Sequence, residues 1–251
     1  MKIFLTSLLS LSFFVCFGQA RLRGLDVAYE KNASDLLEQF LQTWAAEIQP
    51  ITSMDSLGEL EQDAYAIFKD VFTPFDWERF SKEETEIFGL PRKSPYGSTK
   101  YIVVQTSVQI AVYDTDDLNY APHKGPNGPL LAKKKVVNFR PDVKFDQAKT
   151  LFLSSEYKNL LLEFITAHHD YALSDSRLAF LNTKLHIVRG HWMGWHIESF
   201  PRVEILEFNR DRTLARVHFR LGYASGASIL YTKNPEGKWG ASGYANHLWI
   251  E

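Results

Sequence analysis

Two kinds of hydrophobic spacing divide the chain. Apolar residues recur about every 3.6 positions over residues 34–48, which predicts an amphipathic helix with Ser34 as its N-cap. A second helix is predicted from Ser56, because Glu59 stands three residues later in the capping-box position. Similar signals predict a short third helix over residues 81–89. The first third of the chain is therefore expected to be helical.

The spacing changes to alternation in residues 100–113, where every second residue is apolar or β-branched. This pattern predicts one long strand with one buried face. The lysine run Lys133–Lys135 predicts a solvated edge strand, and binding of an anionic polymer is the alternative. Further helices are predicted over residues 154–170 and 175–181. The other strands are predicted over residues 185–197, 203–208, 213–223, 229–232 and 239–249, with a type I turn at Asn234–Gly237.

This order of elements predicts an α+β fold in which N-terminal helices pack on a strongly bent antiparallel β-sheet. The pattern favours a single α+β domain over residues 21–251. The helical segment 32–90 as a subdomain of its own is the alternative.

The first twenty residues have the pattern of a secretory signal peptide. Lys2 precedes an apolar run from Ile3 to Phe17, and Gly18 and Ala20 occupy the −3 and −1 positions of a cleavage site. We therefore expect cleavage after Ala20 and a secreted or periplasmic protein. The run is short for a membrane span, and no second one follows it, so no integral membrane segment is expected in the mature chain. An uncleaved anchor and lipoprotein processing at Cys16 are the alternatives.

The amino-acid composition limits the kinds of functional site that we expect in the mature chain. Cys16 is the only cysteine, so the mature chain is expected to contain no disulfide, thiolate nucleophile or cysteine–metal site. Residues 32–90 carry thirteen Asp and Glu against three Lys and Arg, and residues 184–251 carry six against nine. Neither segment is basic enough to predict nucleic-acid binding. The nucleophile elbow, the phosphate-binding glycine–lysine loop, the zinc-binding H-E-x-x-H helix and the dinucleotide fingerprint are absent from the sequence, so we expect no cofactor and no metal site.

The strand predicted over residues 185–197 leads to the candidate catalytic residues. On an extended strand, His196 and Glu198 share one face and lie roughly 6–7 Å apart. Such a pair suits general-base catalysis, with the carboxylate orienting the imidazole, or metal ligation. Neither chemistry is complete without a third group, and His218 would have to be brought in by the fold.

The same region supplies candidate ligand-binding residues. Aromatic rings and histidines on the first strand, with nearby arginines as donors to an anionic group, suit a glycan, an apolar or an anionic ligand. These candidates are His191, Trp192, Trp195, His196, Arg202 and Arg220. The pattern favours a structural interpretation of these residues, in which Gly190 and Gly194 make room for core rings, and Arg216, His218 and Arg220 form a solvated sheet face balanced by Glu204 and Glu207.

The last seventy or so residues contain several distinctive short segments, namely Gly190-His191-Trp192, Gly194-Trp195-His196-Ile197, Pro201, Ala215–Arg220, Gly222-Tyr223 and Trp249-Ile250-Glu251. In these positions the chain resembles a group of uncharacterised secreted bacterial proteins. The order of elements also resembles the cystatin-like or NTF2-like α+β architecture, whose members include enzymes, ligand carriers and interaction modules. The long helical front and the Pro/Gly-rich loop at residues 122–129 depart from that architecture.

These observations favour a secreted, non-enzymatic binding or interaction protein. The expected partner is a small molecule, a glycan or an envelope protein. The alternatives are a hydrolase- or isomerase-like enzyme that uses the His196/Glu198 pair, and a structural envelope component.

Overall fold

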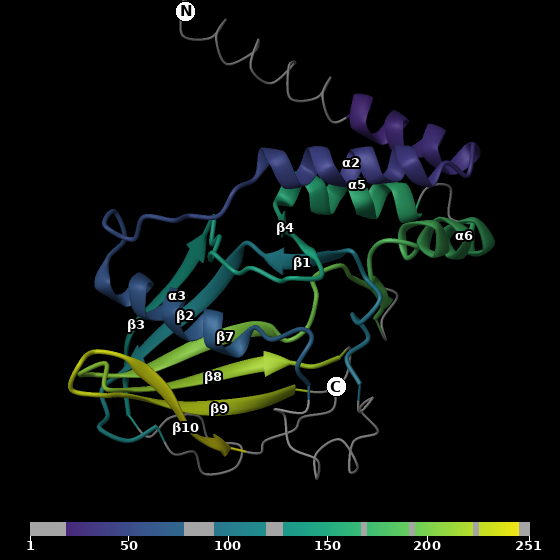
Figure 1. The fold of residues 1–251 in the computed structure, drawn as a ribbon. Coiled ribbons are helices and arrows are strands. Elements are labelled where there is room, and N and C mark those ends of the chain that lie inside the picture. The colour runs from purple at the N-terminus through teal and green to yellow at the C-terminus, as the bar shows by residue number, and fades with distance from the viewer. Residues whose placement is uncertain are drawn as a thin grey trace, which may run out of the picture.

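Six strands form a mixed sheet in the order β10-β9-β8-β7-β2-β3 (Figure 1). The computed structural model describes residues 19–77, 93–118, 128–166, 170–190, 194–222 and 226–245. The strands of this sheet are β2 (Ser107–Tyr113), β3 (Leu130–Val137), β7 (Arg202–Asn209), β8 (Leu214–Arg220), β9 (Gly226–Lys233) and β10 (Trp239–Ala245). Together with the helices, this sheet confirms the predicted α+β fold class.

The pairing within this sheet is not antiparallel throughout. Strands β7 to β10 form an antiparallel meander, as expected for consecutive strands that alternate apolar and polar residues. Strand β2 is antiparallel to β3 but parallel to β7, with Gln109 opposite Ile205. The parallel pair joins segments that lie far apart in the sequence, so local alternation does not reveal it.

The strand predicted over residues 100–113 is broken at Thr106. Its first half, β1 (Tyr101–Gln105), pairs in parallel with β4 (Lys149–Leu153) in a separate two-stranded sheet. Its second half is β2 of the large sheet. All residues of β1 are buried, so the prediction of a single strand with one buried face is wrong for this half.

Two hydrophobic clusters meet at β1. Ile102 and Val104 belong to the first cluster, which joins the large sheet to helix α3 (Glu59–Val71). Tyr101 and Val103 point the other way, into a second cluster built around α2 (Ser34–Glu47), α5 (Ser155–Thr166) and α6 (Tyr171–Leu181). Figure 1 shows α2 and α5 side by side, away from strands β8 to β10. Of the predicted N-terminal helices that lie within the described residues, α3 packs on the large sheet and α2 does not.

Acidic side chains fasten helix α3 to the far strands of the sheet, and one of them, Asp70, accepts a hydrogen bond from the Tyr231 hydroxyl at 2.6 Å. Asp63 is 7% exposed, and its Oδ1 accepts hydrogen bonds from Lys233 Nζ at 2.7 Å and from Trp239 Nε1 at 2.9 Å. A buried carboxylate is stable only when charged or polar donors surround it. This contact therefore fixes the side of the sheet that α3 covers.

The helices begin differently from the predictions. The N-caps of α2 and α3 are Ala33 and Gly58, and neither makes a side-chain capping bond. The two helices are confirmed, but the predicted caps at Ser34 and Ser56 are wrong. Helix α6 begins earlier than predicted because Asp170 caps it, with its side chain accepting hydrogen bonds from two backbone amides.

Residues 19–30 are helical, which the hydrophobic pattern did not predict. In this helix, the Arg21 guanidinium contacts the carboxylates of Glu47 at 2.8 Å and Glu156 at 2.7 Å. The contacts tie the start of the helix to α2 and to α5. Residues 1–18, which make up most of the predicted signal peptide, lie outside the described residues.

The strand predicted over residues 185–197 is not continuous. It is replaced by two short antiparallel strands, β5 (Val188–Arg189) and β6 (Trp195–His196), and residues 191–193 between them lie outside the described residues. Glycines at positions 190 and 194 explain the loss of regular strand geometry here. The predicted helix 81–89 and the end of the final predicted strand, residues 246–249, also lie outside the described ranges.

Two further local predictions are confirmed. Strand β3 is an edge strand with Lys133, Lys134 and Lys135 exposed, as the lysine run predicts. In the turn after β9, the Gly237 amide donates to the Asn234 carbonyl at 2.9 Å.

Candidate functional site

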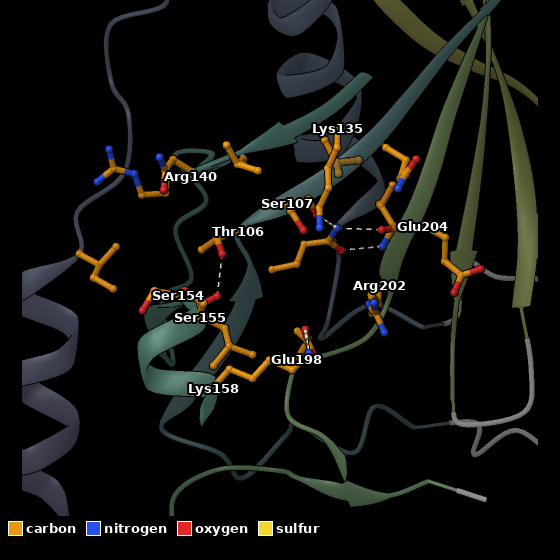
Figure 2. A pocket seen from close by; sticks show the side chains of 18 residues that line it. Thr106, Ser107, Lys135, Arg140, Ser154, Ser155, Lys158, Glu198, Arg202 and Glu204 are labelled. Carbon is orange, nitrogen blue, oxygen red and sulfur yellow. Dashed lines mark hydrogen bonds and ion pairs between the residues drawn. The ribbon is translucent and has the colours of Figure 1, made fainter. Parts of the chain in front are cut away.

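A cavity of about 810 Å³ lies where β1 gives way to β2 (Figure 2). Its walls come from residues 105–109, the end of β3, the first turn of α5 and the start of β7. The volume is in the range of sites that bind small molecules. Because the cavity lies at the corner between the two sheets, it brings together side chains that are far apart in the sequence.

Gln105 holds the corner that forms the back of the cavity. Its Nε2 donates to the carbonyls of Ser107 and Val203, both at 2.7 Å, and its Oε1 accepts from the Val203 amide at 2.8 Å. The side-chain amide thus bonds to Val203 in both directions, as a neighbouring strand would. Gln105 is 6% exposed, so these bonds satisfy polar groups that water does not reach.

Thr106 fixes the opposite wall. Its Oγ1 donates to the Leu153 carbonyl at 2.6 Å, and its own carbonyl accepts from the Phe139 amide at 2.9 Å. The first bond reaches the end of β4, and the second reaches the segment after β3. The break in the predicted strand is therefore held open by hydrogen bonds on both sides.

The first turn of α5 faces the cavity. Ser154 and Ser155 line it, and Ser154 Oγ accepts a hydrogen bond from the Tyr157 amide at 3.3 Å. The start of a helix carries a partial positive charge because its first amides have no partners within the helix. This end of the cavity therefore favours negative charge.

Among the described residues that line the cavity, positively charged side chains outnumber negatively charged ones. The lining contains two carboxylates, and each has a basic partner. Glu204 pairs with Nε of Arg220, and Glu198 lies 3.6 Å from Nζ of Lys158. Figure 2 shows Arg202 and Glu204 on β7, with Lys158 and Glu198 at the α5 end.

Three further cations line the cavity, namely Lys135, Arg140 and Arg202. Within the described ranges, no carboxylate lies within ion-pair distance of any of them. The Nε atom of Arg140 is also buried, and no described residue forms a hydrogen bond with it. Figure 2 places Arg140 and Arg202 at opposite ends, so the excess positive charge extends along the cavity.

The cavity includes two of the residues that the sequence nominated. Arg202, a ligand-binding candidate, and Glu198, a catalytic candidate, both line it. Arg220 lies next to it through its ion pair with Glu204. His218, the third catalytic candidate, lies on β8, where its Nε2 is 2.9 Å from a carboxylate oxygen of Glu207.

The aromatic part of the predicted site lies elsewhere. Trp195 packs in the second cluster, with the Arg189 guanidinium 5.0 Å above its ring. The His196 ring lies 5.9 Å from the Phe200 ring, and a side chain on Gly190 would come within 2.9 Å of its Nε2. Neither Trp195 nor His196 is among the residues that line the cavity. His191 and Trp192 lie outside the described residues.

The row of basic residues on β8 differs from its prediction. Arg216 is 2% exposed, so the prediction of a solvated face is wrong at that position. The predicted balance by glutamates is confirmed, because His218 contacts Glu207 and Arg220 contacts Glu204.

Several lining residues were not predicted as site residues, among them Gln105, Arg140 and Lys158. The signal for the first was present, since Gln105, Thr106 and Ser107 interrupt an otherwise apolar alternation. Three successive polar residues in a strand pattern indicate a corner. Arg140 and Lys158 carry no such local signal, because only the fold brings them to the cavity.

Comparisons with protein-family models, curated proteins and solved structures returned no match. Over the described ranges, no group of three or more His, Cys, Asp or Glu side chains is placed to hold a metal ion. In the same ranges, no helix has both the length and the hydropathy of a membrane span.

Proposed function

We propose that the protein is a secreted, non-enzymatic binding protein that takes a small anionic molecule into the cavity at the β1–β2 corner. The observation that carries the proposal is the set of three cations, Lys135, Arg140 and Arg202, which line the cavity with no carboxylate partner in the described part of the chain. A small molecule suits this cavity better than a glycan chain or an envelope protein does, because its volume of about 810 Å³ matches a compact ligand.

Electrostatics supports an anionic ligand. Cations that share one cavity repel one another, and an anion between them turns this repulsion into attraction. Guanidinium groups donate charge-assisted hydrogen bonds to carboxylate, phosphate or sulfate groups. The first turn of α5 adds backbone amides and a favourable helix dipole at the same cavity.

The export proposal rests on the sequence of the first twenty residues. Cleavage after Ala20 would leave Arg21 as the first residue of the mature chain. Arg21 is held through its side chain by Glu47 and Glu156, so its anchoring does not need the preceding segment. N-terminal sequencing of the secreted protein tests this part, and a mature chain that still contains Phe14 would refute it.

Calorimetric titration of the chain from residue 21 onward tests the binding proposal. Phosphate, sulfate, citrate and glucose 6-phosphate are the anionic probes, and glucose is the neutral control. We expect at least one anion to bind and glucose not to bind. We expect the affinity to fall with ionic strength, because salt screens the attraction.

Variants locate the site. Arg202→Gln and Lys135→Gln are each expected to weaken anion binding about ten- to a hundredfold, the value of a hydrogen bond to a charged group. Lys133→Gln is the matched control: Lys133 lies on the same strand and the same face as Lys135, but outside the cavity lining. Equal losses in Lys135→Gln and Lys133→Gln, or no binding of any anion, would refute the proposal.

A further inference from the structure

Several ionisable side chains line the cavity. Among those that form no hydrogen bond with a described residue, Glu198 is the most buried. The residue is 9% exposed, and its nearest basic atom is Lys158 Nζ at 3.6 Å. That contact is an ion pair but exceeds hydrogen-bond length. In the described part of the chain, no hydrogen bond reaches the Glu198 carboxylate.

The Glu198 carboxylate opens into the cavity. An ionised carboxylate has about four acceptor positions, and those of Glu198 accept no hydrogen bond from the described residues. Lys158 offers weak compensation, because its side chain is 42% exposed and is free to point into water. The acceptor positions of Glu198 that face the cavity are therefore suited to a donor on a bound molecule.

We infer that the ligand carries a hydrogen-bond donor beside its acidic group, and that Glu198 binds this donor. The inference rests on the proposed function, since it describes the same site. Glu198 and Arg202 line one cavity and are joined by a short segment through Pro201. A carboxylate that shares one cavity with cations that have no carboxylate partner among the described residues suits a molecule that carries both a donor and an acidic group. α-Amino acids and α-hydroxy acids share this chemistry, with an ammonium or a hydroxyl as the donor.

A matched series of dicarboxylates tests the inference. Aspartate, malate and succinate have the same carbon chain and carry an ammonium, a hydroxyl or no donor at the second carbon. We expect aspartate or malate to bind roughly ten- to a hundredfold more tightly than succinate, since a hydrogen bond to a charged acceptor has that value. The better of the two identifies the donor.

The role of Glu198 is tested by Glu198→Gln, which keeps the shape of the side chain and removes its charge. We expect this variant to lose most of the preference for aspartate or malate over succinate. Glu163→Gln is the control, because Glu163 is an exposed residue of α5 outside the cavity lining. Fluorescence-monitored unfolding of both variants confirms that they are folded.

The outcomes separate the two proposals. If succinate binds as tightly as aspartate and malate, or if Glu198→Gln keeps the preference, the inference is overturned and the anion site stands. If none of the three compounds binds, the inference is also overturned. The proposed function then depends on the phosphate, sulfate, citrate and glucose 6-phosphate titrations.

Discussion

Replacing Gln105 by methionine is expected to destabilise the protein strongly, because one side chain holds the corner between the two sheets. The replacement keeps the length of the side chain but removes three hydrogen bonds of 2.7, 2.7 and 2.8 Å. Val203 is 2% exposed, so water does not replace the lost partners of its N–H and C=O groups. At roughly 1–3 kcal/mol for each buried unsatisfied group, these two groups predict a loss of about 2–6 kcal/mol.

Urea unfolding followed by circular dichroism measures this loss as a change in the free energy of unfolding. Gln109→Met is the matched control, because Gln109 is half-buried on β2 and its side chain makes no hydrogen bond within the described ranges. We expect the control to change stability by less than about 1 kcal/mol. If both variants lose the same stability, the account of the corner is wrong. Because Arg202 precedes Val203, Gln105→Met is also expected to weaken anion binding.

Three other predictions concern the contacts that assemble the fold. Arg21→Ala removes a bridge between the N-terminal helix and two carboxylates, and we expect a loss of about 1–2 kcal/mol in urea unfolding. Asp63→Asn removes the charge partner of Lys233 and weakens the hydrogen bond to Trp239. We expect thermal unfolding to show a lower midpoint, with a loss of about 1–3 kcal/mol in the free energy of unfolding. Burial lowers the pKa of His186 below its ordinary value of 6.5. As the pH falls through 6.5, the unfolded chain therefore takes up a proton at this histidine before the folded chain does, and the free energy of unfolding decreases. His186→Phe is therefore expected to lose less unfolding free energy than the wild type between about pH 7 and pH 5, and an equal loss would contradict the assignment.

The elements that the sequence predicts well are those with local causes. Helix α2 follows from a 3.6-residue stripe, and the turn at Asn234–Gly237 follows from residue types suited to its positions. The meander from β7 to β10 follows from alternation and short connections. Each of these depends on residues within a few positions of one another.

The elements that the sequence does not predict depend on distant partners. The parallel pairing of β2 with β7 and the division of residues 101–113 between two sheets are decided by segments that arrive much later in the chain. An alternating strand looks the same in sequence whether one or both of its faces are buried against a core, as β1 shows.

The candidate site follows the same rule. The sequence predicts Glu198 as the strand neighbour of His196 and Arg202 as a donor to an anionic group, and both line the cavity. The cavity, however, lies at a corner that the prediction treated as a continuous strand. Trp195 and His196 were predicted as part of the site, but their rings pack against Arg189 and Phe200 instead.

The most direct test of the anion site is a crystal of the protein, grown without sulfate or phosphate and soaked in selenate. Anomalous scattering from selenium locates the bound anion without reference to any assumed ligand. The account predicts a peak inside the cavity, within hydrogen-bond distance of Arg202 or Lys135. A well-ordered cavity without such a peak, with selenate bound only elsewhere on the protein, would contradict it.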